Sequence, residues 1–446
     1  MPSCSMYSRS CSISPAFSSS TVTLISSPSP EISGRIAGFV MDARKYAKAA
    51  AELGIHVLDT WPWWNILIRL PAKSVLRFRA VCKAFRDHIS SPEFLREFQR
   101  LQKPQPLILP ADYARDDPRY VHLEAIDLLT DQVRHIFRFA TAAAGEQYVH
   151  RAPGTIVFAV HGSVDGLLLV SFLDSWYVCN PSLRQWAPMP ALDPHEVVGF
   201  YSHAASGEYR VLYQKGADDP SVDTCYYIIT VGSQQAARSI GCPVSPATML
   251  EAWFDRRQVG LEGAFREPPA LVGGNLYWPQ RDRIMVFDTA AEVFSWIDSP
   301  DTNSVMKLME MESNSRLGAL KVGLWILEDH EGEIWAHACR IELSLAQITM
   351  GSAGSDRCTP FVVSPEGDVL IECPSTPLNL GDDELEVWPA CLLHYSKKDE
   401  ERGKFNFEHN WTTSPTHLLK ESLLPHAFLQ PQVDGDALTP PFFQGL

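Results

Sequence analysis

The pattern of apolar residues changes once along the chain, near residue 104. Between Val75 and Ile89 apolar side chains recur every three or four residues, at positions 75, 78, 82, 85 and 89, which places them on one face of a helix. From residue 104 onwards apolar residues fall in short or alternating runs separated by Gly, Pro, Asp and Asn, which is typical of strands and turns. The pattern predicts a small helical region followed by a large all-β region.

Prolines and serines divide the helical region into segments. Pro71 disfavours helix in the residue before it, so one helix is expected to end near Leu70 and another to begin with Pro71 in its first turn. The run Ser90-Ser91-Pro92-Glu93 has the order of a helix cap, a first-turn proline and an acidic residue, which predicts a further helix start. We therefore expect three short helices over roughly residues 58–102.

The segment from Ile66 to Pro92 reads I-L-x-R-L-P-A-K-S-V-L-R-F-R-A-V-C-K-x-F-R-x-x-I-S-S-P and resembles the second half of an F-box, a helical docking module. The opening departs from the family, because Trp61 stands where an acidic residue is usual and Pro62-Trp63 where leucines are usual. The resemblance implies that this region binds a Skp-type adaptor through apolar residues. We predict adaptor binding by Leu58, Ile66, Leu67, Leu70, Pro71, Val75, Leu76, Val81 and Cys82.

A weak repeat runs through the all-β region. Gly166–Trp186 and Gly274–Trp296 each contain a glycine turn, an apolar run, an Asn or Asp and a tryptophan, and a looser third copy begins at Gly367. Each unit predicts two or three antiparallel strands. Units of about 40–55 residues predict a β-propeller of about six or seven blades, and a large β-sandwich is the alternative fold.

The run Val178-Cys179-Asn180-Pro181-Ser182-Leu183-Arg184-Gln185-Trp186 is similar to the V-C-N-P-x-T-R-x-W element of the F-box-associated domain of plant F-box proteins. Gly199–Tyr213 and Leu324–Asp329 resemble two further elements of that domain. The fold class expected is therefore an α+β multidomain chain, with a three-helix F-box before a propeller-like domain. We predict a disordered Ser-rich tail, the F-box, the F-box-associated domain and a C-terminal tail at 1–50, 53–102, 104–430 and 431–446.

Composition narrows the classes of partner. The net charge of −15 over 446 residues argues against nucleic-acid binding, whereas the basic residues concentrated in 69–100 would attract an acidic protein surface. No apolar run approaches the ~18–20 residues of a membrane span, so no membrane partner is expected. The ten cysteines show no C-x-x-C or paired His/Cys spacing, which predicts reduced thiols and no metal site.

The tail at residues 1–34 is rich in serine and poor in acidic residues, as transit peptides are, but its basic residues are sparse and Met41 opens a more ordinary start. A disordered tail, or a gene model extended upstream, is therefore favoured over a transit peptide. We expect a cytoplasmic or nuclear location, or both, in preference to the chloroplast.

The sequence contains no nucleophile-elbow, phosphate-loop, dinucleotide or zinc-protease motif, so we predict no enzymatic activity and no cofactor. The resemblance implies a substrate-recognition subunit of an SCF-type ubiquitin ligase. Its partners would be a Skp-type adaptor, through it the cullin and RING subunits, and an unknown target protein. The alternatives are an adaptor-independent, protein-binding propeller with a degenerate F-box, and a propeller enzyme.

Overall fold

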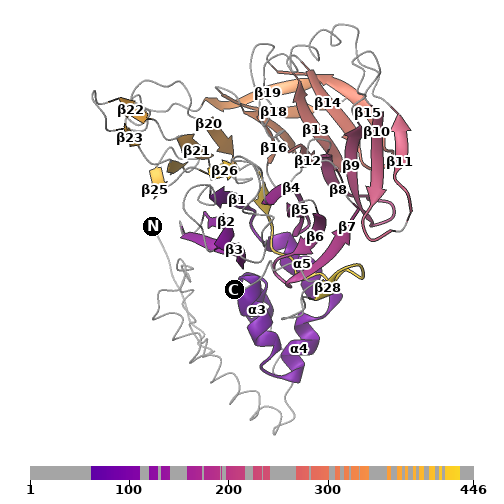
Figure 1. The fold of residues 1–446 in the computed structure, drawn as a ribbon, viewed down its shortest axis with the longest axis vertical. Coiled ribbons are helices and arrows are strands. Elements are labelled where there is room, and N and C mark those ends of the chain that lie inside the picture. The colour runs from indigo at the N-terminus through magenta and orange to yellow at the C-terminus, as the bar shows by residue number, and fades with distance from the viewer. Residues whose placement is uncertain are drawn as a thin grey trace, which may run out of the picture.

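Figure 1 shows the computed structural model of the chain, with the helices beneath a ring of β-sheets. The structure describes residues 62–110, 120–128, 132–140, 158–172, 175–190, 192, 197–215, 225–233, 235–241, 268–280, 283–300, 307–311, 316–320, 323–330, 332–340, 359–362, 369–373, 377–379, 385–387, 391–395, 401–406, 411–413 and 417–431. The predicted tail at 1–50 and the predicted adaptor residue Leu58 lie outside these ranges.

Four described helices occupy the region where three were expected: α2 (Pro62–Leu67), α3 (Ala72–Arg79), α4 (Lys83–Ile89) and α5 (Pro92–Leu101). The apolar stripe from Val75 to Ile89 is divided between α3 and α4, because the backbone is extended at Cys82 (φ −154°) and the helix is interrupted there. The Cys82 sulfur then caps α4 by accepting a hydrogen bond from the Phe85 N–H at 3.5 Å. The predicted start of α5 is confirmed, since Ser91 Oγ accepts from the Phe94 N–H at 3.2 Å.

Aromatic side chains fill the core of the helical region. Phe94 and Phe98 are fully buried and stack with ring centroids 6.2 Å apart. Trp64 meets Phe94 edge-on at 5.3 Å and His88 at 5.0 Å. One of the unusual tryptophans of the motif is thus part of the core, where edge-to-face aromatic pairs are favourable.

The expected all-β region is confirmed. Its described strands form six antiparallel sheets of four or five strands, which follow one another in chain order, and one separate pair. The first sheet contains β1 (Gln105–Pro110), β2 (Tyr120–Asp127) and β3 (Gln132–Ala140), joined by β26 (Trp411–Thr413) and β27 (Leu418–Leu419). The second contains β4 (Phe158–Val164), β5 (Leu167–Phe172), β6 (Ser175–Asn180) and β7 (Gln185–Met189), joined by β28 (Gln430–Pro431).

The remaining sheets are built from consecutive strands. The third contains β8 (Val197–Ser202), β9 (Tyr209–Lys215), β10 (Cys225–Thr230) and β11 (Arg238–Gly241), and the fourth β12 (Ala270–Val272), β13 (Asn275–Gln280), β14 (Arg283–Asp288) and β15 (Val293–Asp298). The fifth contains β16 (Lys307–Met311), β17 (Arg316–Leu320), β18 (Gly323–Asp329) and β19 (Ile334–Arg340). The sixth contains β20 (Thr359–Val362), β21 (Val369–Cys373), β24 (Cys391–Tyr395) and β25 (Glu401–Asn406), and β22 (Pro377–Asn379) pairs with β23 (Leu385–Val387).

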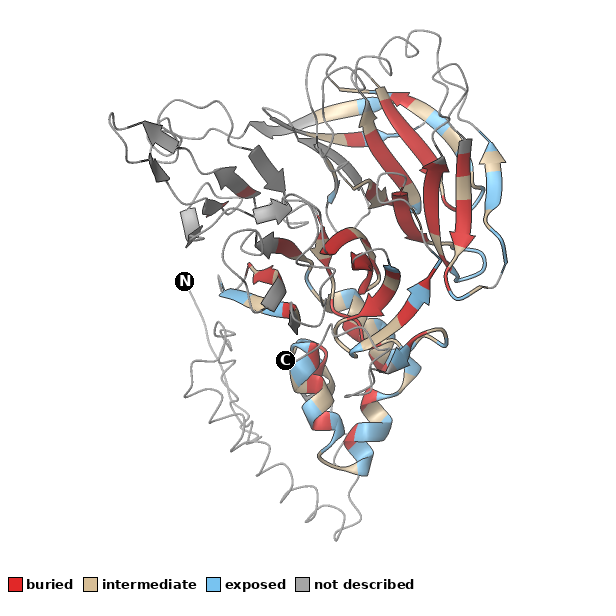
Figure 2. Ribbon diagram, in the orientation of Figure 1, coloured by how far each residue is buried: buried red, intermediate tan, exposed pale blue. Residues whose placement is uncertain are grey.

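Each of the first four sheets shares a hydrophobic core with the next one in the chain. Phe158 of the second sheet packs with Phe137 of the first, and Val164 of the second with Val211 of the third. The third and fourth sheets share a core, as do the fourth and fifth. Figure 2 shows buried residues along the strands of these sheets, whereas β11 at the edge of the third sheet is largely exposed. Sequential packing of this kind makes a propeller-like ring rather than a two-layer sandwich.

The sequence repeat corresponds to equivalent strands of the second and fourth sheets. Asp165-Gly166 and Gly273-Gly274 are two-residue hairpin turns in which both residues have positive φ, as a type I′ turn requires. The third copy proposed at Gly367 begins outside the described residues.

A third equivalent of the repeat appears in the fifth sheet. Turns of four residues follow Asn180, Asp288 and Asp329, and each ends in a charged residue with φ between 51° and 56°. These left-handed residues are Arg184, Glu292 and Glu333. An aromatic residue follows each of them two positions later: Trp186, Phe294 and Trp335.

Candidate functional site

The residues predicted to bind an adaptor divide between core and surface. Leu67 and Val75 are completely buried, so they stabilise the helices rather than face a partner. Ile66 is 48% exposed, which makes it an unusual large apolar side chain on this surface, and Pro71 is also exposed. The others among the described set are partly buried: Leu70, Leu76, Val81 and Cys82.

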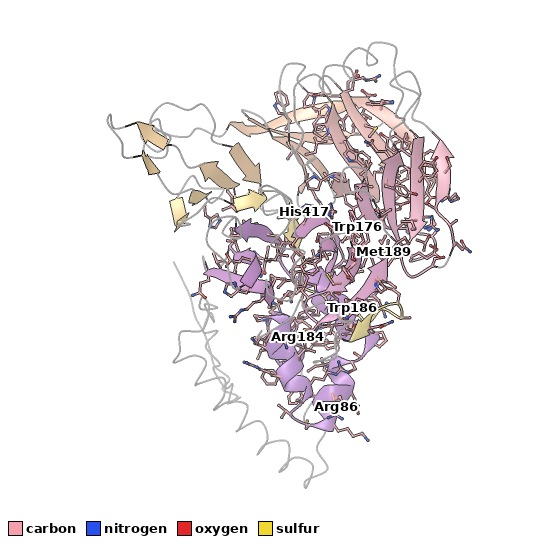
Figure 3. The ribbon with its side chains drawn as sticks, viewed as in Figure 1. Arg86, Trp176, Arg184, Trp186, Met189 and His417 are labelled. Atoms are coloured by element: carbon pink, nitrogen blue, oxygen red, sulfur yellow. The ribbon has the colours of Figure 1, made fainter. Side chains whose placement is uncertain are left out.

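The exposed part of the helical region is strongly basic. Between residues 62 and 91 the exposed charged side chains are those of Arg69, Lys73, Arg77, Arg79, Lys83, Arg86 and Asp87. Six of these seven are positive, in a chain whose net charge is −15. Figure 3 places Arg86 at the outer end of the helices, away from the ring. A surface of this kind attracts an acidic protein partner and sets its orientation.

The opposite side of the helices contacts the ring. Gln99 Nε2 donates to the Asp165 carbonyl at 3.2 Å, and Leu183 packs against the helical core. Both contacts lie in turns of the second sheet, β4–β5 and β6–β7, so the helices sit at one end of that sheet. The helical region and the ring are therefore in direct contact, with the basic surface left open.

The Cys-Asn-Pro element lies at this junction between the helices and the ring. Asn180 is fully buried; its Oδ1 accepts from the Leu183 N–H at 3.1 Å and its Nδ2 donates to the Ser422 carbonyl at 3.1 Å. Trp186 packs edge-on against Tyr177 with ring centroids 5.7 Å apart. Figure 3 shows Arg184 and Trp186 near the helices.

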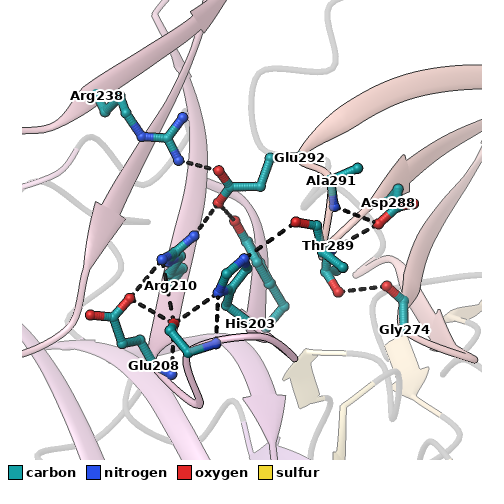
Figure 4. Close-up of polar contacts among 12 residues, drawn as sticks. His203, Glu208, Arg210, Arg238, Gly274, Asp288, Thr289, Ala291 and Glu292 are labelled. Carbon is teal, nitrogen blue, oxygen red and sulfur yellow. Dashed lines mark hydrogen bonds and ion pairs between the residues drawn. The ribbon is translucent and has the colours of Figure 1, made fainter.

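A second cluster of charged side chains joins the third and fourth sheets (Figure 4). Glu292, in the turn between β14 and β15, accepts hydrogen bonds from Arg210 and Tyr201 of the third sheet at 2.5 and 3.0 Å. Arg238 also donates to Glu292. Arg210 in turn reaches Glu208 at 2.6 Å. The cluster ties neighbouring sheets through one carboxylate that sequence analysis did not single out.

Electrostatics within the cluster favour the ionised carboxylate. Burial would raise the pKa of Glu292, but the hydrogen bonds from Arg238, Arg210 and Tyr201 outweigh it and hold that pKa below its usual range. Burial, together with the neighbouring Glu292, raises the pKa of the Tyr201 hydroxyl. The tyrosine therefore remains a neutral donor to a charged acceptor.

Replacing Glu292 by alanine is expected to lower the free energy of unfolding by about 1–3 kcal/mol, because two arginines and a tyrosine lose a charged acceptor. Denaturant unfolding measures the change. Glu208→Ala is the matched control, since Glu208 shares Arg210 but is 47% exposed, and its loss should be smaller. Equal effects of the two substitutions would show that the cluster contributes nothing beyond a surface ion pair.

Side chains that could bind a metal ion are dispersed in the part of the chain that the structure describes. No group of three or more His, Cys, Asp or Glu side chains there could hold a metal ion. Asp288 caps its turn by accepting from the N–H groups of Ala290 and Ala291. None of the described helices is long and apolar enough to cross a membrane.

Comparison with known proteins identifies both regions. The F-box domain model matches residues 62–97, and the model of the F-box associated beta propeller domain matches residues 140–371. A putative F-box protein of Arabidopsis thaliana is 24% identical over 386 residues, which cover 79% of this chain and 81% of the relative. A second Arabidopsis thaliana F-box protein is 23% identical over 304 residues, covering 63% and 77%.

Solved structures are more distant. The match to virginiamycin B lyase from Staphylococcus aureus, at 10% identity, covers 69% of this chain and 86% of the lyase chain with a TM-score of 0.33, from which we infer nothing.

The propeller-domain match spans 232 of the 446 residues and follows the F-box, as the sequence resemblance implied. F-box proteins of this type are typically substrate receptors rather than enzymes. The chain belongs to the F-box proteins that carry an F-box associated β-propeller domain.

Proposed function

We propose that this protein is the substrate-recognition subunit of an SCF-type ubiquitin ligase. In this function the F-box binds a Skp-type adaptor, and through it the cullin and RING subunits, while the propeller binds the target protein. The observation that carries the proposal is the placement of the F-box, whose inner side is held on the ring while its basic outer surface and Ile66 remain open.

The adaptor surface combines an apolar anchor with a basic surround. Exposed Ile66 and Pro71 supply apolar contact, and partly buried Leu70 and Leu76 can add to it. Buried apolar anchors usually provide most of the binding energy of an interface, whereas the charged rim governs association rate and orientation. The adaptor that fits this surface has an acidic rim around an apolar groove.

The target is expected at the end of the propeller away from the F-box. The turns near the F-box are short, such as the two-residue turn Asp165-Gly166. Some connections that leave the other ends of the strands are longer; the one between β11 and β12 runs from residue 242 to residue 269. Loops of rigid scaffolds commonly carry recognition residues.

Such a subunit promotes a reaction without taking part in bond making or breaking. Holding the target on the propeller while the F-box is bound to the ligase makes the encounter with the ubiquitin-charged enzyme effectively intramolecular. The cullin, RING and conjugating subunits would supply the transfer chemistry. The protein would work in the cytoplasm or nucleus, in keeping with Cys82 and Cys179, which are free thiols.

Ile66→Asp in the full chain is expected to weaken binding to a Skp-type adaptor at least tenfold without unfolding the protein, because Ile66 is exposed and a carboxylate there opposes apolar docking. Calorimetric titration with the adaptor measures the affinity. Ile334→Asp is the matched control, since Ile334 is 54% exposed on the propeller and should leave the affinity unchanged.

The alternative, an adaptor-independent propeller with a degenerate F-box, makes the opposite prediction. It requires that the folded, unsubstituted chain fails to bind any Skp-type adaptor. The packing of Trp64 against Phe94 and His88 favours the ligase function, because this tryptophan supports the helical core instead of disrupting it.

A further inference from the structure

Residues 417–431, here called the C-terminal strap, return from the end of the described chain to the junction between F-box and ring. The strap begins in the first sheet, where the His417 carbonyl accepts from the Leu107 N–H at 2.8 Å. It then crosses the second sheet, where the Leu418 carbonyl accepts from Ser163 Oγ at 2.7 Å. It ends as β28, paired with the outer strand β7. The strap therefore contacts the propeller along most of its length.

The middle of the strap packs against the F-box helices. Leu423 is buried in the hydrophobic core formed by the F-box helices. Glu421, also buried, accepts a hydrogen bond at Oε2 from the Ala72 N–H at 2.7 Å, across 349 positions of sequence. The two parts of the molecule are thus joined by a segment that comes from neither the F-box nor the linker after it.

The contact with Ala72 supplies what helix α3 lacks. The residue before α3 is Pro71, which gives no side-chain hydrogen bond to the helix, and its first turn contains no acidic residue. The free N–H groups of a helix start favour an oxygen acceptor and a negative charge. Glu421 provides both from the far end of the chain.

The second oxygen of the same carboxylate reaches the ring. Glu421 Oε1 lies 2.9 Å from Arg134 Nη1 on β3, and Arg134 also donates from Nε to Gln105 of β1 at 3.1 Å. One carboxylate therefore bridges helix α3 and the first sheet. The Glu421 side chain is 10% exposed and that of Arg134 is 32% exposed, so salt and solvent screen this ion pair less than a surface pair.

We propose that Glu421 is a positioning residue of the ligase, which fixes the orientation of the F-box relative to the propeller and so the place where a bound target is held. This inference rests on the proposed function for its consequence. The bridge that Glu421 makes between Ala72 and Arg134, here called the clamp, does not itself depend on an adaptor. The covalent link is only residues 102–104, between α5 and β1. A short link limits the distance between the two parts but not their angle, which the Glu421 contacts restrict together with those of Gln99, Leu183 and Leu423.

Amide hydrogen exchange of the full chain tests the clamp. Glu421→Ala is expected to speed exchange in the first turn of α3 about tenfold or more. It should also speed exchange in the turn that holds Leu183, a separate contact between F-box and ring, because the whole F-box can then pivot. Glu421→Gln keeps an acceptor for Ala72 but loses the ion pair, so its effect should be smaller. Glu97→Ala, on the exposed side of α5, should change neither region.

Two results would overturn the proposal. Faster exchange confined to the first turn of α3 would make Glu421 a local helix cap, and unchanged exchange would remove its role altogether. Adaptor titration separates this inference from the proposed function. The Glu421→Ala variant should bind the adaptor as tightly as the unsubstituted chain. If neither the variant nor the unsubstituted chain binds the adaptor, the ligase function is refuted but the hydrogen-exchange result still stands.

Discussion

Replacing Gly166 by alanine is expected to lower the free energy of unfolding by about 2–4 kcal/mol. Gly166 has a φ of +81°, which costs an L-residue about 1–2 kcal/mol. A Cβ there would also lie 2.4 Å from the Ser422 Cβ and 2.7 Å from the Lys420 carbonyl oxygen. Because one of these is a backbone atom of the C-terminal strap, the clash cannot be relieved by rotating a side chain.

Gly207→Ala separates the two contributions. Gly207 has a similar φ of +69°, but nothing lies within 4 Å of the position that its Cβ would take. Denaturant unfolding should therefore show only the backbone cost at Gly207 and the larger loss at Gly166. Equal losses at both positions would mean that the strap does not pack closely on the Asp165-Gly166 turn.

A second large effect is expected from acid. Burial lowers the pKa of His417 to about 4, although a hydrogen bond with the Val160 backbone acts in the opposite direction. The unfolded chain binds a proton near pH 6.5 and the folded chain does not until about pH 4, so stability is present above pH 6.5 and is lost as the pH falls through this window. The loss amounts to about 3 kcal/mol.

Unfolding free energies measured between pH 7.5 and pH 4 test this expectation. His417→Gln should flatten the dependence in that window, because an amide does not titrate there. His135→Gln is the control, since the His135 side chain is 50% exposed, and it should retain the dependence of the unsubstituted chain. A profile that His417→Gln leaves unchanged would assign the acid sensitivity to other groups.

Local sequence signals predicted most of the helical region correctly. Pro71 located the start of α3 and Ser91-Pro92 that of α5. The three- and four-residue spacing of apolar residues identified the buried face. The spacing could not show the break at Cys82, because α3 and α4 place their apolar residues on a common core, and the periodicity continues across the turn between them.

In the propeller, strand prediction worked where apolar runs were bounded by turns, as in β5 and β21. The apolar run Leu320–Leu327 would suggest a single strand, but it contains the end of β17 and the start of β18, which are only two residues apart in the sequence. The sheet partners of β27 and β28 could not be predicted, since they pair with strands more than two hundred residues earlier.

The proposed adaptor surface was only partly predictable. A motif gives the order of residues but not which side of each helix faces the core, so buried Leu67 and exposed Ile66 received the same role. Glu421 gave no signal in the sequence, because its partners Ala72 and Arg134 are distant and belong to different regions. The four-residue turn repeat ending in Arg184, Glu292 and Glu333 was visible in principle as an Asn or Asp followed six positions later by an aromatic residue.

The return of the strap to helix α3 has a consequence for the newly made chain. Synthesis at about 5–20 residues per second separates the appearance of Ala72 from that of Glu421 by roughly 20–70 s. During that interval the F-box helices lack Leu423 in their core and the acceptor at the start of α3. A chain released before the strap is made therefore lacks the contacts of Glu421 and Leu423 with the F-box helices, although those of Gln99 and Leu183 can still form. Translation through residue 423 must therefore precede completion of the F-box core.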